Sequence, residues 1–231
     1  MQSFDQIYQR ALKRKGGKAQ LQALLPEVVS PTAASNIGSD RFLAEMTRCI
    51  FQAGFVWRVI NLKWQGFEDA FFSFVPLKML LLSPEQIERL GKDTRIVRNM
   101  QKIISVPKNA QFILDVEREH NSFGEFIGHW PGDNLVELFQ IMKKRGNRLG
   151  GMTGPRVLRN LGIDTYVLTK DVVHCLQLAD IDIRDNPSSK RDQLKIQTAF
   201  NQWQSESGLP LAHISRICAC SVGKNNLPVK Q

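Results

Sequence analysis

Apolar residues recur at spacings of three and four over most of this chain, which is the periodicity of amphipathic helices. The pattern predicts helices over residues 4–14, 39–54, 83–93, 94–120, 133–146, 154–162, 169–179, 189–208 and 210–223. Residues 55–74 are expected to form two short helices broken at Gly66, and Pro107 is expected to kink or interrupt its helix. Because strand signals are nearly absent, the sequence predicts an all-α fold.

With 231 residues, the chain is long enough for one large domain or two small lobes. Ser83 followed by Pro84 suits the N-cap and the first turn of a helix. The sequence contains no internal repeat and no low-complexity tract. We therefore expect a single domain over residues 1–223, followed by a flexible tail at residues 224–231.

The overall composition is that of a globular protein with a polyanionic partner. Of the 231 residues 42% are hydrophobic, and 31 Lys and Arg residues against 22 Asp and Glu residues give a net charge of +9. No apolar run approaches the ~18 residues that span a bilayer, and the charged N-terminus lacks the apolar core of a signal peptide. These observations predict a cytoplasmic protein without a membrane partner.

The cysteines are expected to be free thiols, as is usual for a cytoplasmic protein of this size. They are Cys49, Cys175, Cys218 and Cys220. The last two are separated by a single residue, which is not a recognised zinc-binding spacing. We expect no metal site there.

The segment Lys143–Pro155, KKRGNRLGGMTGP, carries the strongest local signal for function. Its glycines permit backbone angles that side chains forbid, and the helix expected after it presents a positive N-terminal end. Such a turn can bind a phosphate through its backbone N–H groups, and the adjacent basic residues favour a nucleic acid. The candidate DNA contacts are Lys143, Lys144, Arg145, Arg148, Gly150, Gly151, Met152, Thr153 and Gly154. The alternative is an ordinary basic surface loop between two helices.

Two helices joined by residues 149–153, LGGMT, resemble the helix-hairpin-helix module of DNA glycosylases, although Thr153 departs from the usual final glycine. The segments QAGFVW (residues 52–57) and KRGNRLGG, together with LSPEQIERLGKDTRIVRNMQKI, resemble the DNA-3-methyladenine glycosylase I family more specifically. The resemblance runs from about Phe42 to Cys175. It implies a helix-hairpin-helix at about residues 133–162 and two helical lobes with the DNA and base cleft between them.

The resemblance implies an enzyme of base excision repair. Members of this family flip 3-methyladenine out of alkylated DNA and hydrolyse the bond between the base and the sugar. The methylated base already carries a positive charge and leaves without being protonated, so the enzyme needs a pocket for a cationic purine. No cofactor is implied. The expected partner is alkylated double-stranded DNA, bound by a monomer at the nucleoid without an obligatory protein partner.

The implied base pocket includes Trp57, Gln52 and Phe55. Trp57 aligns with the family's base-pocket tryptophan, and the alternative is a core residue among apolar neighbours. The family's base-recognition glutamate is replaced here by Cys49. Glu45 lies four residues earlier on the same helical face, so it is the candidate to supply the missing carboxylate. The alternative is a solvent-exposed acid.

Further departures from the family bear on metal binding and catalysis. The family's better-known branch holds a zinc ion with Cys and His residues from both ends of the chain. Here the first 40 residues contain neither, and the C-terminal pair matches Asp171 and Cys175, so no zinc is expected. Pro155 occupies the place of the lysine of lyase members, which predicts a monofunctional hydrolase. The superfamily's aspartate falls at Thr169, and Asp171 could serve in its place only if the turn is shifted.

Two other functions stay open at this point. One is a helix-hairpin-helix protein that binds damaged DNA without cutting the glycosidic bond, which Cys49 and the missing zinc ligands favour. The other is a glycosylase for a different labile alkylpurine. Met152, at the tip of the turn, is one candidate wedge for the space left by a flipped base, and the alternative is a residue that packs within the hairpin.

Overall fold

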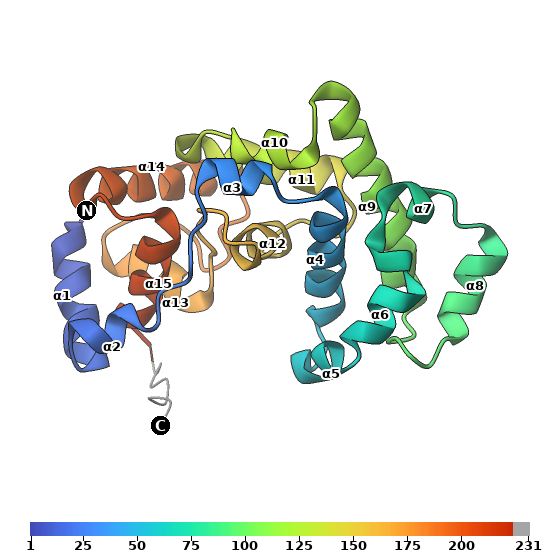
Figure 1. Ribbon diagram of the computed structural model, residues 1–231. Helices are drawn as coiled ribbons and strands as arrows, with labels where there is room; N and C mark the ends of the chain where they lie inside the picture. Colours follow the sequence, from blue (N-terminus) through green and yellow to red (C-terminus); the bar gives the residue numbers. More distant parts are fainter. Residues whose placement is uncertain (224–231) are drawn as a thin grey trace. The chain divides into compact units, whose positions relative to one another are not determined.

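The computed structural model describes residues 1–223, which form helices and turns with no strand among them (Figure 1). The first α-helices are α1 (Phe4–Lys15), α2 (Lys18–Gln22), α3 (Pro31–Ser35), α4 (Ser39–Gln52), α5 (Trp57–Leu62), α6 (Trp64–Ala70), α7 (Pro76–Leu80) and α8 (Pro84–Lys92). The others are α9 (Met100–Glu119), α10 (Phe123–Gly128), α11 (Leu135–Arg145), α12 (Thr153–Asn160), α13 (Lys170–Leu178), α14 (Lys190–Ser207) and α15 (Leu211–Ser221). Two 3-10 helices are η1 (Phe72–Phe74) and η2 (Gly132–Asn134). The all-α prediction is confirmed.

The chain is divided into two compact units. The central unit comprises Ser30–Trp130 and Leu138–Leu161, and the terminal unit comprises Met1–Val29, Pro131–Glu137 and the chain from Gly162 onward. The expected flexible tail lies outside the described residues. Within the described part of the chain, no helix is both long enough and apolar enough to cross a bilayer.

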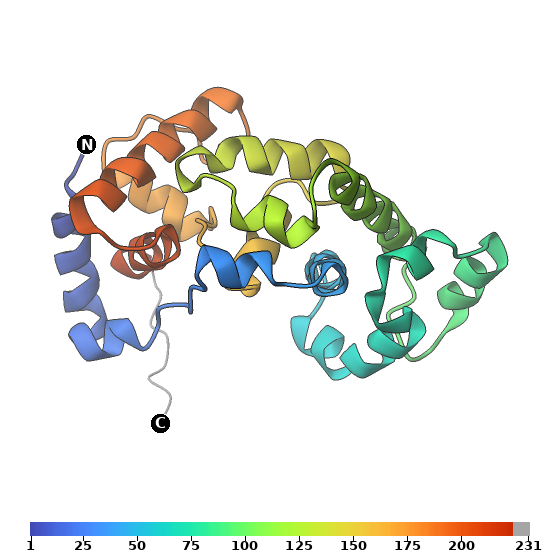
Figure 2. The same ribbon diagram turned by 45° about the horizontal axis from the view of Figure 1, so that its top comes forward.

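The terminal unit is built around α1, α14 and α15, which pack against one another (Figures 1 and 2). Trp203 of α14 is fully buried, and its ring meets that of Phe200 at a centroid distance of 5.7 Å. The indole N–H of Trp203 donates a hydrogen bond to the backbone carbonyl of Gln2. Burial of such a large side chain with its polar group satisfied ties the N-terminal segment to the unit's core.

The central unit is organised around α4, which packs against α9 and α12 (Figure 1). From Phe42 to Gln52, every residue of α4 except Arg48 is buried. α9 runs through Pro107 as one helix, so Pro107 does not interrupt it, and the expected kink stays a prediction. Buried residues on both sides of the proline, including Ile103 and Ala110, hold the helix together despite the missing N–H donor.

The position of one helix break differs from the sequence prediction, and the cap of α8 agrees with it. The break between α5 and α6 falls at Lys63 and not at Gly66, which lies inside α6. A Cβ atom on Gly66 would meet the backbone oxygen of Arg95 at 2.6 Å, so this glycine permits a close approach between chain segments. Ser83 caps α8 as predicted. Its Oγ accepts a hydrogen bond from the N–H of Gln86, and the side-chain oxygen of Gln86 accepts one from the N–H of Ser83, which completes a capping box.

Candidate functional site

Glu45, Cys49 and Asn160 form a polar cluster where α4 meets α12 in the central unit. The Oε1 atom of Glu45 accepts a 2.7 Å hydrogen bond from Asn160 Nδ2 and a 3.4 Å hydrogen bond from Cys49 Sγ. Glu45 and Cys49 are only 8% and 6% exposed, so the alternative of a solvent-exposed acid is wrong. Burial and the neighbouring carboxylate raise the pKa of Cys49 well above its ordinary value. The thiol therefore stays protonated and acts as a donor.

Arg48 gives this carboxylate a positive neighbour without a hydrogen bond. Its Nε atom lies 3.7 Å from Glu45 Oε2, and its guanidinium carbon lies 4.1 Å from the ring centroid of Trp64. Trp64 is itself stacked against Phe67 and Phe74, so the arginine rests on a fixed aromatic surface. Among residues 1–223, Oε2 of Glu45 accepts no hydrogen bond, in contrast to Oε1.

Trp57 begins α5 and is 50% exposed, so it is not a core residue. The guanidinium carbon of Arg156 lies 5.0 Å from the centroid of its ring. Arg156 also acts electrostatically on Cys49. Arg156 and Asn160 are four residues apart on α12, so a single face of this helix contacts both Trp57 and Glu45.

Lys102 of α9 holds the turn that follows α4. Its Nζ atom donates hydrogen bonds to the carbonyls of Phe51, at 3.1 Å, and Ala53, at 2.6 Å. The same ammonium group lies 4.7 Å from the ring centroid of Phe55, which is 42% exposed. Burial and the nearby Arg148 lower the pKa of Lys102. A cation thus satisfies carbonyls at the negative end of α4.

Gln52, another predicted pocket residue, is buried at the end of α4. Its side-chain amide donates a 3.2 Å hydrogen bond to Asn61 Oδ1 of α5. The bond joins the two helices across the turn at Gly54, whose φ of +73° lies in the left-handed region. Gln52 therefore has a structural role in fixing this turn.

The turn between α11 and α12 satisfies part of its own hydrogen-bonding potential. The N–H of Gly154 donates to the carbonyl of Leu149, and the N–H of Thr153 donates to the carbonyl of Gly150. These two N–H groups are engaged, so they are unsuited to hold a phosphate. Within the described residues, the N–H groups of residues 150–152 make no hydrogen bond, which narrows the predicted phosphate site to them.

Asn109 of α9, which is fully buried, anchors this turn to the body of the central unit. Its Oδ1 accepts a 2.7 Å hydrogen bond from the N–H of Asn147, and its Nδ2 donates at 3.1 Å to the carbonyl of the same residue. This paired arrangement fixes the start of the turn relative to α9. Arg148, the next residue, has a φ of +61° and donates a 2.7 Å hydrogen bond to Gln101.

The predicted basic contacts are all exposed, and they are Lys143, Lys144, Arg145 and Arg148. Arg145 forms a two-pronged ion pair with Glu119, with N–O distances of 2.6 and 2.8 Å. Within residues 1–223 the two lysines form no ion pair. Met152 is 42% exposed and directly precedes α12, and its role as a wedge stays a prediction.

Asp171 lies in the terminal unit, in the first turn of α13. Thr169 is the N-cap of this helix, where its Oγ1 accepts a 3.3 Å hydrogen bond from the N–H of Val172. Thr169, the position at which the superfamily's aspartate is expected, therefore lies at the start of a helix. The catalytic role of Asp171 stays a prediction.

All four cysteines are free and buried, as the sequence predicted. The Sγ atom of Cys175 accepts a 3.8 Å hydrogen bond from Arg10 Nη2 and lies 3.3 Å from Ser221 Oγ. Hydrogen bonding from Cys218, with smaller contributions from Ser221 and Arg10, lowers the pKa of Cys175 to about 7. In the described part of the chain, no three Cys, His, Asp or Glu side chains are grouped to bind a metal ion. The absence of zinc stays a prediction.

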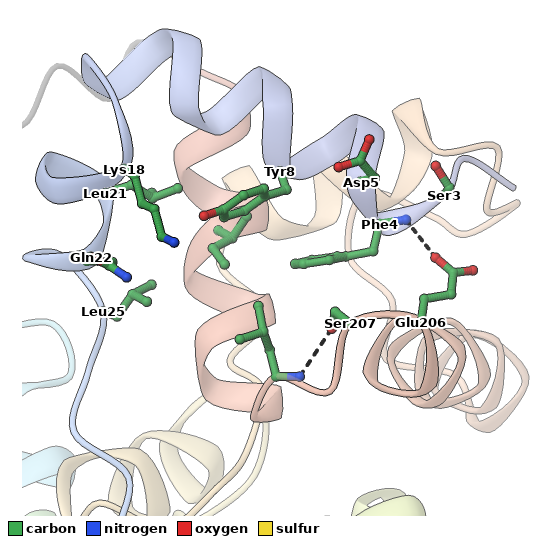
Figure 3. Close-up of a pocket in the computed structure, with 12 residues that line it drawn as sticks. Ser3, Phe4, Asp5, Tyr8, Lys18, Leu21, Gln22, Leu25, Glu206 and Ser207 are labelled. Atoms are coloured by element: carbon green, nitrogen blue, oxygen red, sulfur yellow. Dashed lines mark hydrogen bonds between the residues drawn. The ribbon is translucent and has the colours of Figure 1, made fainter.

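A cavity of about 600 Å³ lies in the terminal unit, lined by residues of α1 and α2, the end of α14 and α15 (Figure 3). Its polar rim includes Tyr8, Lys18 and Glu206, and Glu206 Oε2 accepts a 2.7 Å hydrogen bond from the N–H of Phe4. None of the residues predicted from the sequence to form the site lines this cavity. The candidate site therefore lies elsewhere.

Residues 36–147 match the family model described as methyladenine glycosylase. The match covers just under half of the chain. The chain is 32% identical over 120 residues to DNA-3-methyladenine glycosylase 1 of Escherichia coli strain K12, a match that covers 44% of this chain and 64% of that protein. The DNA-3-methyladenine glycosylase of Haemophilus influenzae is 28% identical over 76 residues, covering 33% and 41% of the two chains. The chain thus spans less than two thirds of these relatives.

The methyladenine glycosylase resemblance extends to a solved structure. The structure of 3-methyladenine DNA glycosylase I from Staphylococcus aureus aligns with a TM-score of 0.50 and 22% sequence identity, covering 60% of this chain and 80% of that one. At this identity the likeness shows the fold alone. It agrees with the all-α glycosylase fold expected from the sequence.

Sequence reasoning missed several residues of the site, of which the most important are Asn160, Arg156 and Lys102. Asn160 is 115 residues from Glu45 along the chain. Their contact depends on the packing of α12 against α4, which no local pattern predicts. The one available signal was the four-residue spacing of Arg156 and Asn160 on an amphipathic helix, which places them on a common face.

Proposed function

We propose that this protein is a DNA repair glycosylase that hydrolyses the N-glycosidic bond of 3-methyladenine in alkylated DNA. The observation that carries the proposal is the buried carboxylate of Glu45 beside Cys49, in a chain whose residues 36–147 match the methyladenine glycosylase family model. Glu45 supplies, from one helical turn earlier, the acceptor that the sequence lacks at Cys49. A carboxylate stabilises a cationic base and accepts hydrogen bonds from its amino group.

In this mechanism Trp57 offers an aromatic ring to the flipped base. Stacking and cation–π attraction of ~0.5–2 kcal/mol favour a positively charged purine on such a ring. Because the alkylated base leaves without protonation, Glu45 stabilises the base without donating a proton, and water completes the hydrolysis. Pro155 at the lyase-lysine position makes the reaction monofunctional, without strand cleavage.

The turn between α11 and α12 is proposed to grip the DNA backbone. The N–H groups of residues 150–152 are free to bind a phosphate, and Lys143 and Lys144 add attraction that does not depend on base sequence. Glycosylase action on duplex DNA then requires no cofactor and no protein partner. We propose a monomer that acts on DNA in the cytoplasm.

The decisive experiment is to incubate the protein with methylated DNA and to identify the released bases by chromatography, with a denaturing gel to detect strand cleavage. Release of 3-methyladenine without nicks is expected. Glu45→Gln is expected to lower the rate by at least about tenfold, because a hydrogen bond to a charged group is worth ~1.5–3 kcal/mol. The control Glu88→Gln removes an exposed carboxylate that pairs with Lys92 on the same helix, and it should leave the rate unchanged.

A second candidate function is binding of damaged DNA without base release. It is favoured by Arg156, whose guanidinium already occupies one face of Trp57. In the same experiment, tight binding to methylated DNA with no released base would support it and would refute the glycosylase. Release of another alkylpurine in place of 3-methyladenine would support a glycosylase with a different substrate.

A further inference from the structure

Asn160 makes the shortest hydrogen bond to Glu45, and no residue pattern assigned it a role. Its Nδ2 atom lies 2.7 Å from Glu45 Oε1 and 3.6 Å from Cys49 Sγ. The protonated Cys49 thiol donates to the same oxygen, at 3.4 Å. Two donors from two different helices therefore converge on Oε1 alone.

We propose that Asn160 is a positioning residue, which holds Oε1 of Glu45 so that Oε2 is presented to the flipped base. The inference rests on the proposed function. A glutamate side chain has three rotatable bonds, so an unrestrained carboxylate loses conformational entropy when it binds a ligand. A hydrogen bond that fixes one oxygen beforehand removes part of that cost and aims the other oxygen.

The remaining neighbours of Glu45 cannot orient the carboxylate in this way. Arg48 lies 3.7 Å from Oε2, which is too long for a hydrogen bond, and its guanidinium is stacked on Trp64. Arg48 therefore attracts the carboxylate of Glu45 electrostatically but does not fix its orientation. Arg156 is stacked on Trp57. Asn160 is thus the residue outside α4 that directs Glu45 through a hydrogen bond.

Asn160 also links the pocket to the predicted phosphate-binding turn. It is the last residue of α12, the helix that begins at Thr153 directly after that turn. The other end of the turn is fixed to α9 through Asn109 and Asn147. A phosphate bound at residues 150–152 would therefore lie at one end of a short helix whose other end holds the base-recognition carboxylate.

The test is a double-mutant cycle of Asn160→Ala and Glu45→Gln, with release of 3-methyladenine from methylated DNA as the readout. If Asn160 acts through Glu45, Asn160→Ala lowers the rate about tenfold in the wild-type protein and has no further effect in the Glu45→Gln background. Equal losses in both backgrounds, or no loss in either, would overturn the inference. Asn121→Ala is the matched control, because Asn121 donates a 2.9 Å hydrogen bond to Glu125 at an exposed site.

The isosteric variant Asn160→Asp provides a second readout that a merely structural role would not change. It places a second carboxylate beside Glu45, and two adjacent carboxylates repel until they share a proton. Its rate relative to wild type should therefore recover as the pH falls from 8 to 6. The neighbouring groups are Arg48 and the protonated Cys49 thiol, which contact Glu45, and Arg156, which acts on Cys49; all three are common to both proteins. A ratio that does not change with pH counts against the inference.

A measurement that does not depend on base release distinguishes failure of the proposed function from failure of the positioning role of Asn160. If the wild-type protein releases no base, the side-chain carboxyl resonance of Glu45 is followed by NMR in protein labelled with carbon-13 at glutamate, and it is assigned by its loss in Glu45→Gln. A shift of this resonance in Asn160→Ala, but not in Asn121→Ala, supports positioning by Asn160. An unchanged resonance refutes it whatever the enzymatic activity.

Discussion

The side-chain amide of Asn160 donates a 2.7 Å hydrogen bond to the carboxylate of Glu45, which lies 115 residues earlier in the chain. The bond joins the helix that follows the glycine-rich turn to the helix that precedes the QAGFVW segment. It places a buried carboxylate one helical turn from Cys49, where the sequence resemblance leads us to expect a glutamate. We propose that Glu45 supplies the carboxylate in place of that residue.

Replacement by alanine should mainly reduce ligand binding at Trp57 and mainly reduce stability at Trp203. Trp57 is half exposed, so Trp57→Ala should cost less than ~1 kcal/mol of stability while weakening binding of free 3-methyladenine. Trp203 is fully buried, and Trp203→Ala should cost about 3–5 kcal/mol. Chemical denaturation and a binding titration measure the two effects. A large loss of stability in Trp57→Ala would contradict its assignment to the pocket.

Lys102 should stabilise the central unit through the carbonyls at the end of α4. Lys102→Met keeps the aliphatic length but removes the donor to Phe51 and Ala53, and it should cost about 1–3 kcal/mol because buried acceptors are left unpaired. Base release should fall as well, since the turn carrying Phe55 loses its support. Lys108→Met, at an exposed position of the same helix, is the control. Equal stabilities of the two variants would disprove this role.

Gly154 should be less replaceable than Gly151. A Cβ atom there would lie 2.8 Å from the carbonyl oxygen of Leu149, which accepts the hydrogen bond closing the turn. Gly154→Ala should therefore destabilise the protein by ~1–3 kcal/mol and weaken DNA binding. Gly151 has a φ of +61° and open space around it, so Gly151→Asn should keep the stability within about 0.5 kcal/mol. Thermal unfolding of both variants decides the comparison.

The interaction of Arg10 with Cys175 should depend on pH. The pKa of Cys175 is lowered to about 7 from an ordinary value of 9.0, so the folded state favours the thiolate. The stabilisation is complete above pH 9 and is lost as the pH falls through 7. Arg10→Gln should therefore destabilise the protein by of order 1 kcal/mol more at pH 9 than at pH 6.

The control for this prediction is the same pair of measurements in a Cys175→Ser background. There the pH-dependent part of the Arg10→Gln effect should disappear. The hydrogen bond from Arg10 to the backbone carbonyl of Ser221 remains as a constant contribution. A pH dependence that survives in Cys175→Ser would assign it to another group.

The sequence by itself determined the helical class, most helix positions and the family resemblance. These follow from local properties, because the spacing of apolar residues and the capping preference of residues such as Ser83 act within one or two turns of a helix. The same locality placed Glu45 and Cys49 on one face of α4. Local preference failed at Gly66, which lies inside α6 and permits a close approach to the backbone of Arg95.

Only the tertiary structure decided which side chains complete the site. Asn160 meets Glu45 and Arg156 meets Trp57 because α12 packs on α4, and Lys102 reaches the end of α4 from α9. The tertiary structure also showed that the N–H groups of Thr153 and Gly154 are already engaged in hydrogen bonds. These contacts join residues far apart in the sequence, and their free energy is gained only when whole helices bury their apolar faces together. No short pattern in the chain encodes that event.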